Sequence, residues 1–199
     1  MDLLESYRSL LKKHGKQGWW PLLETGYHPN NYAIPRTDAE RFVICIGAIL
    51  TQNTAWKNVE KALANLQKIK ALNAKAVLLL DDATLKNAIK PAGYFNQKAK
   101  KLREFAKFYL GLEDKIPSRS EFLSIWGIGR ETADSILLYA YKQPIFVVDA
   151  YTRRLFSLDA DYDEIRLLFE AALPRDYRIY QEFHALIVEE GKRSRAKTK

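Results

Sequence analysis

The fold of this chain is decided by one stretch, Phe122-Leu-Ser-Ile-Trp-Gly127-Ile-Gly129-Arg-Glu-Thr132-Ala-Asp-Ser-Ile-Leu137. It predicts an apolar helix that ends at Trp126, a Gly-Ile-Gly turn, and a second amphipathic helix that begins at once. The two glycines allow a tight hairpin and let the backbone come close to another chain. Ile128, which stands between them, is expected to anchor the hairpin to the core.

The second helix of this hairpin is expected to point its free N–H groups and the positive end of its dipole outward. An anion fits such a position, and the complete pattern favours a DNA phosphate, bound with the help of Arg130 and Thr132. The contact is direct or runs through a monovalent cation, K+ or Na+, on the carbonyls of Gly127, Ile128 and Gly129. No other cofactor is expected. The alternative interpretation is an ordinary helix turn that contains glycine.

The composition is compatible with a polyanionic partner. The chain has 199 residues, with 32 basic and 24 acidic side chains, a net charge of +8 and a pI near 9.4. This excess suits nucleic acid, although solubility alone would also explain it. The single cysteine, Cys45, excludes a disulfide framework and a cysteine-rich zinc or iron–sulfur site. Without a leader or an apolar run of about 20 residues, the protein is expected to be cytoplasmic and unattached to membranes.

Apolar residues recur at helical spacing almost throughout the chain, as at i, i+4, i+7 and i+8 across residues 42–50. Capping boxes at Ser118-Arg-Ser-Glu121 and Asp161-Tyr-Asp-Glu164 predict two helix starts. The one β-like stretch, Ile145-Phe-Val-Val148, is predicted to be an extended, buried connector. The expected fold class is therefore all-α.

Residues 15–36 break the helical pattern, because glycines and prolines interrupt them and Trp19, Trp20, Tyr27 and Tyr32 load them with aromatic rings. A long irregular segment with this many aromatic side chains is typical of a loop that carries function. One of the two tryptophans is expected to fill the core, but not both.

Asp149 follows the buried connector and precedes a helix in Val147-Val-Asp-Ala-Tyr-Thr-Arg-Arg154. Capping of that helix is enough to explain an aspartate at this position. A carboxylate held at a helix N-terminus also stays ionised beside apolar walls. Such an anion stabilises the cationic sugar that forms when a base departs, and it orients the attacking water. The local sequence leaves both interpretations open.

Two further stretches carry side chains that suit DNA. Leu50-Thr-Gln52-Asn-Thr-Ala-Trp56 ends an apolar helix with amides and an aromatic ring, and Gly93-Tyr94-Phe-Asn96-Gln-Lys98-Ala-Lys-Lys101 leads from a glycine turn into a basic helix. Amides such as Asn96 fill hydrogen-bonding gaps, aromatic rings wedge or stack, and lysines such as Lys98 meet phosphates. Taken singly, each stretch is more often a solvated helix end.

From about Glu40 to Arg154, these stretches resemble the helix-hairpin-helix glycosylases of the endonuclease III superfamily. The resemblance implies two helical lobes with a DNA-binding cleft between them. Residues 36–134 would form a six-helix barrel-type lobe that includes the helix-hairpin-helix. Residues 1–35 and 135–199 would form the second lobe from the two ends of the chain.

The resemblance also implies roles for single residues. Asp149 matches the catalytic aspartate, Gln52 the residue that fills the gap left by a flipped nucleotide, and Tyr94 a residue that wedges into the duplex. Bifunctional members carry a lysine nucleophile within the hairpin, where this chain has Glu131. They usually also carry four C-terminal cysteines for an iron–sulfur cluster, which this sequence lacks.

Residues 19–21, 50–54 and 93–99 look most like the branch of 3-methyladenine DNA glycosylases that lacks the cluster. The apolar and aromatic base pocket of that branch maps here to Trp20, Pro21 and Trp56, and a lysine near that pocket is matched by Lys192.

The expected function is thus monofunctional DNA glycosylase activity in base excision repair, with hydrolysis of the N-glycosidic bond of alkylated purines after base flipping. The expected partner is double-stranded DNA with damaged bases, bound by a monomer. A mismatch or oxidised-base glycosylase on the same fold, with or without AP lyase activity, is one alternative. The other is a non-catalytic helix-hairpin-helix DNA-binding protein, which would need neither Asp149 nor an aromatic pocket.

Overall fold

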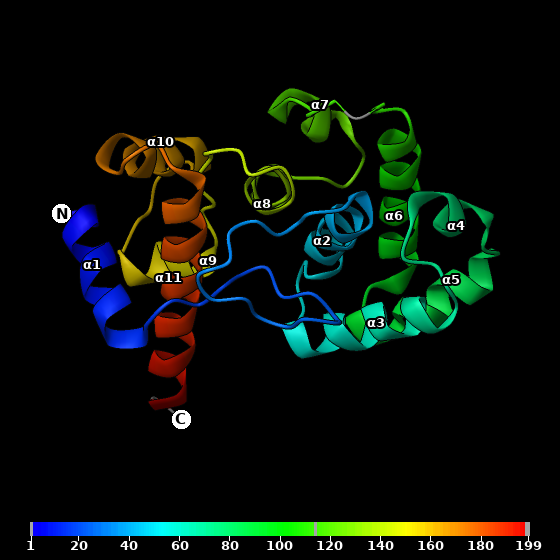
Figure 1. Cartoon of the computed structure of the whole chain (residues 1–199), viewed down its shortest axis with the longest axis horizontal. Coiled ribbons are helices and arrows are strands. Elements are labelled where there is room, and N and C mark those ends of the chain that lie inside the picture. Colours follow the sequence, from blue (N-terminus) through cyan, green and yellow to red (C-terminus); the bar gives the residue numbers. More distant parts are fainter. Residues whose placement is uncertain (1, 114, 198–199) are drawn as a thin grey trace. The chain divides into compact units, whose positions relative to one another are not determined.

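A computed structural model describes residues 2–113 and 115–197, and they form two compact units. Unit 1 consists of Met1–Pro21, Thr25–Ile34 and Leu137–Lys199, and unit 2 of Leu22–Glu24 and Pro35–Ile136. Unit 2 therefore includes the short segment Leu22–Glu24, which the sequence analysis assigned to the lobe formed by the two ends of the chain. The described residues are helical and contain no strand, which confirms the all-α prediction (Figure 1).

Unit 2 contains seven α-helices among its described residues, where six were expected. Their starts follow from capping: Thr37 and Glu40 form a capping box, and Asn73 and Asp81 each accept a hydrogen bond from a backbone N–H of the first turn. The helices are α2 (Asp38–Leu50), α3 (Trp56–Lys68), α4 (Ala74–Leu79), α5 (Asp82–Ile89), α6 (Phe95–Leu110), α7 (Arg119–Ser124) and α8 (Arg130–Ser135), with a 3-10 turn η1 (Lys90–Ala92) between α5 and α6.

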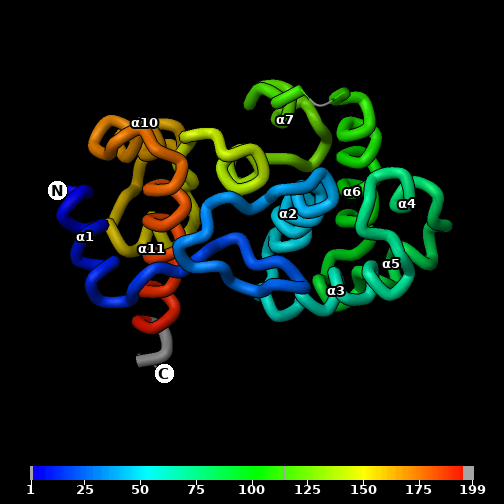
Figure 2. Tube along the Cα trace, in the orientation of Figure 1, coloured from blue at the N-terminus to red at the C-terminus, as the bar shows by residue number. Residues whose placement is uncertain are grey.

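Unit 1 joins the two ends of the chain. Figure 2 shows α1 beside α11, and the two helices are in contact although they are the first and the last helix of the sequence. The elements are α1 (Leu3–His14), α9 (Ala150–Leu155), α10 (Tyr162–Ala172) and α11 (Tyr177–Lys197). A π-helical segment η2 (Ile136–Ala140) continues directly from α8 and carries the chain into unit 1. None of the described helices combines the length and the apolar character that crossing a bilayer requires.

Both predicted capping boxes are present, at Ser118–Glu121 before α7 and at Asp161–Glu164 before α10. The predicted connector is neither helix nor strand. It buries Phe146, Val147 and Val148 to 2% exposure or less, as expected, whereas Ile145 is only half-buried.

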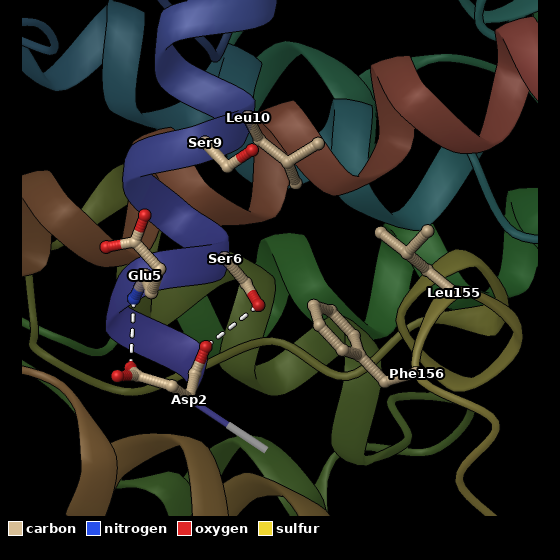
Figure 3. Close-up of a pocket in the computed structure, with 7 residues that line it drawn as sticks. All are labelled: Asp2, Glu5, Ser6, Ser9, Leu10, Leu155 and Phe156. Carbon is tan, nitrogen blue, oxygen red and sulfur yellow. Dashed lines mark hydrogen bonds between the residues drawn. The ribbon is translucent and has the colours of Figure 1, made fainter.

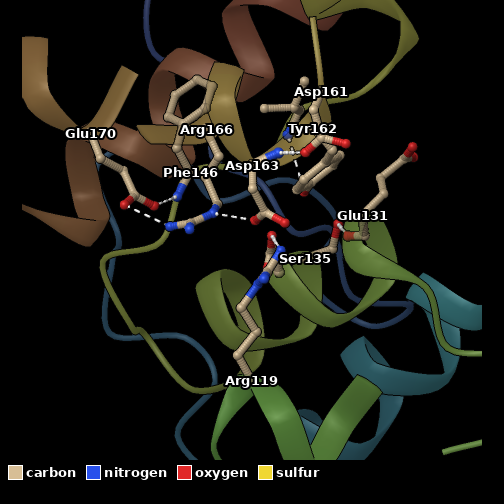
Figure 4. Close-up of polar contacts among 11 residues, drawn as sticks. Arg119, Glu131, Ser135, Phe146, Asp161, Tyr162, Asp163, Arg166 and Glu170 are labelled. Carbon is tan, nitrogen blue, oxygen red and sulfur yellow. Dashed lines mark hydrogen bonds and ion pairs between the residues drawn. The ribbon is translucent and has the colours of Figure 1, made fainter. Parts of the chain in front are cut away.

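Polar side chains fasten this connector to α10. Glu170 accepts a hydrogen bond from the backbone N–H of Phe146 at 2.9 Å. Arg166 in turn pairs with Asp163 at 3.0 Å and with Glu170 at 2.8 Å (Figure 4). Because buried backbone groups need partners, these contacts explain how a segment without regular secondary structure is tolerated inside a helical unit.

Candidate active site and nucleic-acid interface

Asp149 is the N-cap of α9, as one of the two sequence interpretations predicted. One carboxylate oxygen, Oδ1, accepts hydrogen bonds from the backbone N–H of Thr152 at 2.7 Å and from its hydroxyl at 2.9 Å. The side chain is 14% exposed, so the carboxylate is nearly buried but still reaches the surface. Capping therefore occupies one oxygen and leaves the second, Oδ2, for other contacts.

Oδ2 faces an imidazole that the sequence analysis missed. The Nε2 atom of His184 on α11 lies 3.7 Å from Oδ2 of Asp149. On the other side of the ring, Nδ1 lies 2.7 Å from the hydroxyl of Tyr139 on η2, and both side chains are buried. A histidine at a core-facing position of a helix gives no local signal of such a role. We call these three residues the Tyr139–His184–Asp149 chain.

Burial by itself would raise the pKa of Asp149, but the imidazole of His184 and the hydrogen bonds from Thr152 more than offset it. The pKa therefore lies below the usual aspartate value, and the carboxylate is ionised at neutral pH. A buried, ionised carboxylate that still reaches the surface can stabilise positive charge in a bound molecule.

The two adjacent tryptophans differ in burial. Trp20, which was predicted to line the base pocket, is only 5% exposed, and its ring packs on Tyr139 with centroids 5.2 Å apart. Pro21 is buried as well. Trp19 is the more accessible ring, and it meets His184 edge-on at 5.9 Å. One tryptophan thus fills the core, as expected, and Trp19 is the more exposed of the two.

Lys192 lies beside the same ring, with its Nζ atom 5.4 Å from the centroid of Trp19. Lys192, which the resemblance matched to a lysine near the base pocket, therefore lies on α11 near an aromatic ring. Trp56 belongs to unit 2, where it is half-buried and begins α3 instead of ending the preceding helix.

The predicted hairpin is present, but its first helix is shorter than expected. The end of α7 is Ser124 and not Trp126, because Ile125 is already extended, with ψ of 127°. Gly127 has a φ of +83°, which favours glycine, whereas Gly129 has an ordinary extended conformation with φ of −92°. Ile128 is 5% exposed, which confirms it as the anchor of the turn.

At Gly129, a Cβ atom would meet nothing within 4 Å. The start of α8 therefore presents an open backbone surface, next to the exposed side chain of Arg130. Thr132 is 8% exposed, so its hydroxyl serves contacts within the unit more than contacts with a bound molecule.

Gln52 braces this hairpin. Its amide nitrogen donates to the carbonyl oxygen of Gly127 at 3.2 Å and to the hydroxyl of Thr132 at 2.9 Å. Its amide oxygen accepts a hydrogen bond from Lys101, whose side chain lies so close over Gly127 that a Cβ there would be 2.6 Å from Cε. Burial lowers the pKa of Lys101. The sequence singled out Gln52 but not Lys101, because their contact joins α6 to the end of α2.

The stretch at the start of α6 divides into exposed and buried residues. Tyr94 is 66% exposed with φ of +45°, and Asn96 is exposed in the first turn, as DNA contact would require. Lys98, by contrast, is only 2% exposed, and its Nζ donates to the carbonyls of Leu50 at 2.8 Å and Ala92 at 2.9 Å. This burial argues against the predicted phosphate contact of Lys98, whose ammonium instead donates to the last carbonyls of α2 and of η1.

A metal site built from side chains finds no support in the described ranges, where no three His, Cys, Asp or Glu residues gather around one point. The monovalent cation on the hairpin carbonyls stays a prediction. Two carbonyls of the turn already accept hydrogen bonds, that of Ile125 from the N–H of Ile128 at 3.1 Å and that of Gly127 from Gln52.

A hollow of about 410 Å³ lies between α1 and the end of α9 in unit 1 (Figure 3). Asp2 and Glu5 form its rim, and Leu10, Leu155 and Phe156 line its apolar part. Asp2 caps α1 by accepting from the backbone N–H of Glu5 at 2.9 Å. Carboxylates at the rim repel a polyanion, so we do not place the nucleic-acid interface here.

Comparison with known proteins places these features in a family. Residues 46–170 match the model of the HhH-GPD superfamily base excision DNA repair proteins. A protein of Methanocaldococcus jannaschii, provisionally named a DNA repair glycosylase, is 46% identical over 204 residues, which cover 94% of this chain and 86% of that protein. Endonuclease III of Thermotoga maritima is 28% identical over 120 residues, which cover 59% of this chain and 56% of its own length.

Two solved structures show the same fold. The crystal structure of H. pylori 3-methyladenine DNA glycosylase (MagIII) bound to 1,N6-ethenoadenine has a TM-score of 0.77 and 27% identity, covering 98% of this chain and 99% of that one. A non-covalent endonuclease III–DNA complex has a TM-score of 0.74 and 16% identity, covering 94% of this chain and 82% of that one. At the lower identity, the likeness concerns the fold alone.

The buried position of Lys98 makes a prediction about stability. Lys98→Met should lower the free energy of unfolding by about 1–3 kcal/mol, because the carbonyls of Leu50 and Ala92 lose their donor. The salt dependence of DNA binding should not change, because a buried ammonium neutralises no phosphate. Urea unfolding and binding titrations at several salt concentrations measure the two effects. Lys107→Met, on the exposed face of the same helix, is the matched control.

Lys98 also predicts a pH dependence. Burial, with the nearby charge of Lys101, lowers its pKa from 10.5 to about 8. Between these two pH values the unfolded chain keeps a proton that the folded chain has released, so this residue adds stability as the pH rises. The stability of the wild type relative to Lys98→Met should therefore be larger near the upper pH than near the lower one. An unchanged difference would mean that the ammonium is not buried in solution.

Proposed function

We propose, because this chain belongs to the HhH-GPD superfamily of base excision DNA repair proteins, that it is a monofunctional DNA glycosylase that releases alkylated purines. One observation carries the proposal: the Asp149 carboxylate has a lowered pKa at the start of α9, and the accessible ring of Trp19 contacts the imidazole beside it. The likeness to the 3-methyladenine DNA glycosylase of H. pylori supports alkylated purines as substrates.

Hydrolysis breaks the N-glycosidic bond, and its electron pair leaves with the base, so positive charge develops on the sugar at C1′. Asp149 is the anion that stabilises this charge. A water oxygen then bonds to C1′ while Asp149 accepts the proton that the water releases, and the products are a free base and an abasic sugar. A base such as 3-methyladenine already carries positive charge and leaves without strong acid assistance, which suits a site with one carboxylate.

The damaged base must leave the helical stack before this step. An aromatic ring favours a cationic base over a neutral one, and Trp19 offers such a ring in unit 1. Trp56, half-buried at the start of α3, is the second aromatic candidate. The hairpin backbone at Gly129, with Arg130, would bind a phosphate, and the exposed Tyr94 would wedge into the duplex.

Asp149→Asn should abolish base release and leave binding to damaged duplex unchanged or tighter. The substitution removes the charge that acts in the transition state but keeps the size of the side chain. Release of free base from methylated genomic DNA, followed by chromatography, measures the activity, and a gel-shift titration measures binding. Turnover at the wild-type rate would reduce Asp149 to a helix cap. Release of mismatched or oxidised bases instead of alkylated purines would contradict the proposed substrate class.

The two glycines of the hairpin form a matched pair for testing phosphate binding. Gly129→Ala fits the open space at the start of α8 and should keep the wild-type stability, but it should weaken DNA binding, because the new methyl group stands where the phosphate approaches. Gly127→Ala should lose stability, because its φ of +83° and the packed Lys101 side chain resist a Cβ atom. Wild-type DNA affinity of Gly129→Ala would exclude the hairpin as the phosphate site.

We expect the enzyme to leave the abasic strand uncut. Lyase chemistry needs an amine that attacks C1′ and forms a Schiff base, and the hairpin position that would supply it carries Glu131 on α8. The guanidinium of Arg130 is a poor nucleophile. Borohydride should therefore trap no covalent protein–DNA adduct above background, and strand breaks should require alkali or heat. A strong trapped band would contradict the monofunctional assignment, and Lys101 and Lys192 would be the first residues to replace.

A further inference from the structure

The Tyr139–His184–Asp149 chain places a buried histidine between a hydroxyl and the proposed catalytic carboxylate. His184 is 5% exposed, and Tyr139 is 1% exposed. Within the described residues, Nε2 of His184 is a buried nitrogen that makes no hydrogen bond, and Oδ2 of Asp149 lies 3.7 Å from it. Trp19 covers the ring edge-on. The partners of the two ring nitrogens determine which of them carries a proton.

The single proton of the Tyr139 hydroxyl has two possible acceptors: Nδ1 of His184 at 2.7 Å and the carbonyl of Gln181 at 3.2 Å. If Tyr139 donates to Nδ1, a neutral ring carries its proton on Nε2. If Tyr139 donates to Gln181, Nδ1 must itself donate to the hydroxyl oxygen. A neutral ring would then point the Nε2 lone pair at the Asp149 carboxylate, which is repulsive. The geometry therefore favours the first arrangement, in which Tyr139 donates to Nδ1 and Nε2 carries the proton.

We propose that His184 is a positioning residue for Asp149, with its Nε2–H held toward Oδ2 by the hydroxyl of Tyr139. Thr152 holds Oδ1 from the first turn of α9, so the two oxygens are fixed by groups from different elements. A separation of 3.7 Å is too long for a full hydrogen bond. Oδ2 therefore keeps a lone pair for the attacking water while the N–H dipole favours its negative charge. This inference rests on the proposed role of Asp149 in base release.

This arrangement helps to keep Asp149 ionised. Burial raises the pKa of Asp149, and the His184 imidazole opposes it. Two other charged groups lie near the Tyr139–His184–Asp149 chain. The charge of Glu182 helps to raise the pKa of Tyr139, and Lys192 lies near Trp19. Removing the Nε2–H leaves the burial in place, so the Asp149 pKa rises and the carboxylate begins to protonate at a higher pH. Activity that depends on the ionised form is then lost first on the acid side.

Three variants, with a matched control, test this inference through activity. Tyr139→Phe keeps the buried ring but removes the hydroxyl, and His184→Leu removes the N–H. Single-turnover base release should fall by about 10- to 100-fold in His184→Leu, and less in Tyr139→Phe, with the acid limb of the pH profile at a higher pH in both. His184→Gln restores an N–H donor and should recover part of the rate. Tyr180→Phe, the same change at another buried tyrosine, should behave as wild type.

The protonation pattern of the ring gives a readout that does not need activity. The chain has three histidines, so nitrogen-15 NMR of the wild-type protein resolves His184 once His14→Gln and His28→Gln variants assign the other two rings. The expected result is a proton on Nε2 at neutral pH in the wild-type protein. A bare Nε2 would overturn the inference. It would also be overturned by His184→Leu with the wild-type rate and pH profile while Asp149→Asn is inactive. An active Asp149→Asn would instead overturn the proposed function of Asp149 itself.

Discussion

A carboxylate stays ionised in a nearly buried position only where donors replace the water that it has lost. Asp149 meets this constraint with Thr152 on one oxygen and the imidazole of His184 facing the other. Three parts of unit 1 converge to make this possible. The buried connector delivers Asp149 to the start of α9, α11 supplies His184, and η2 places the hydroxyl of Tyr139 behind the ring. The negative charge that results is the one that the proposed cleavage of a glycosidic bond uses.

Unit 2 meets a related constraint at the hairpin, where a turn must keep its shape while one face of its backbone stays open. Gln52 bonds to both Gly127 and Thr132, and Lys101 covers the side of Gly127 on which a Cβ would lie. The open face at Gly129 is thus backed by a satisfied polar cluster. Since all these contacts lie within one unit, the hairpin is shaped before any nucleic acid binds.

The proposed hydrolysis needs few groups near the sugar besides Asp149. A base that is already cationic leaves easily, so one anion and one water suffice, and an aromatic ring such as Trp19 supplies the preference for such a base. An amine would add a second reaction, strand cleavage, and the hairpin carries Glu131 at the place where that amine would stand. The absence of a lysine there and the presence of an ionised Asp149 therefore favour the same reaction, hydrolysis.

Features that depend on neighbours in the sequence were determined by the sequence alone. The capping boxes at Ser118 and Asp161, the glycine turn anchored by Ile128 and the cap at Asp149 are local, because a turn or a helix start involves only a few consecutive residues. Family membership followed from the same local patterns in their order along the chain.

Features that depend on residues far apart in the sequence were decided only by the tertiary structure. Trp19 and Trp20 are adjacent and chemically identical, and only packing against Tyr139 and His184 makes one core and the other accessible. In the sequence, Lys98 looks like any lysine of a basic helix, and only the structure shows that its ammonium is buried against the carbonyls of Leu50 and Ala92. His184 becomes part of the site only because α11 returns past the start of α9. The burial of a side chain depends on many contacts with residues far apart in the sequence, and a short stretch of sequence does not contain those residues.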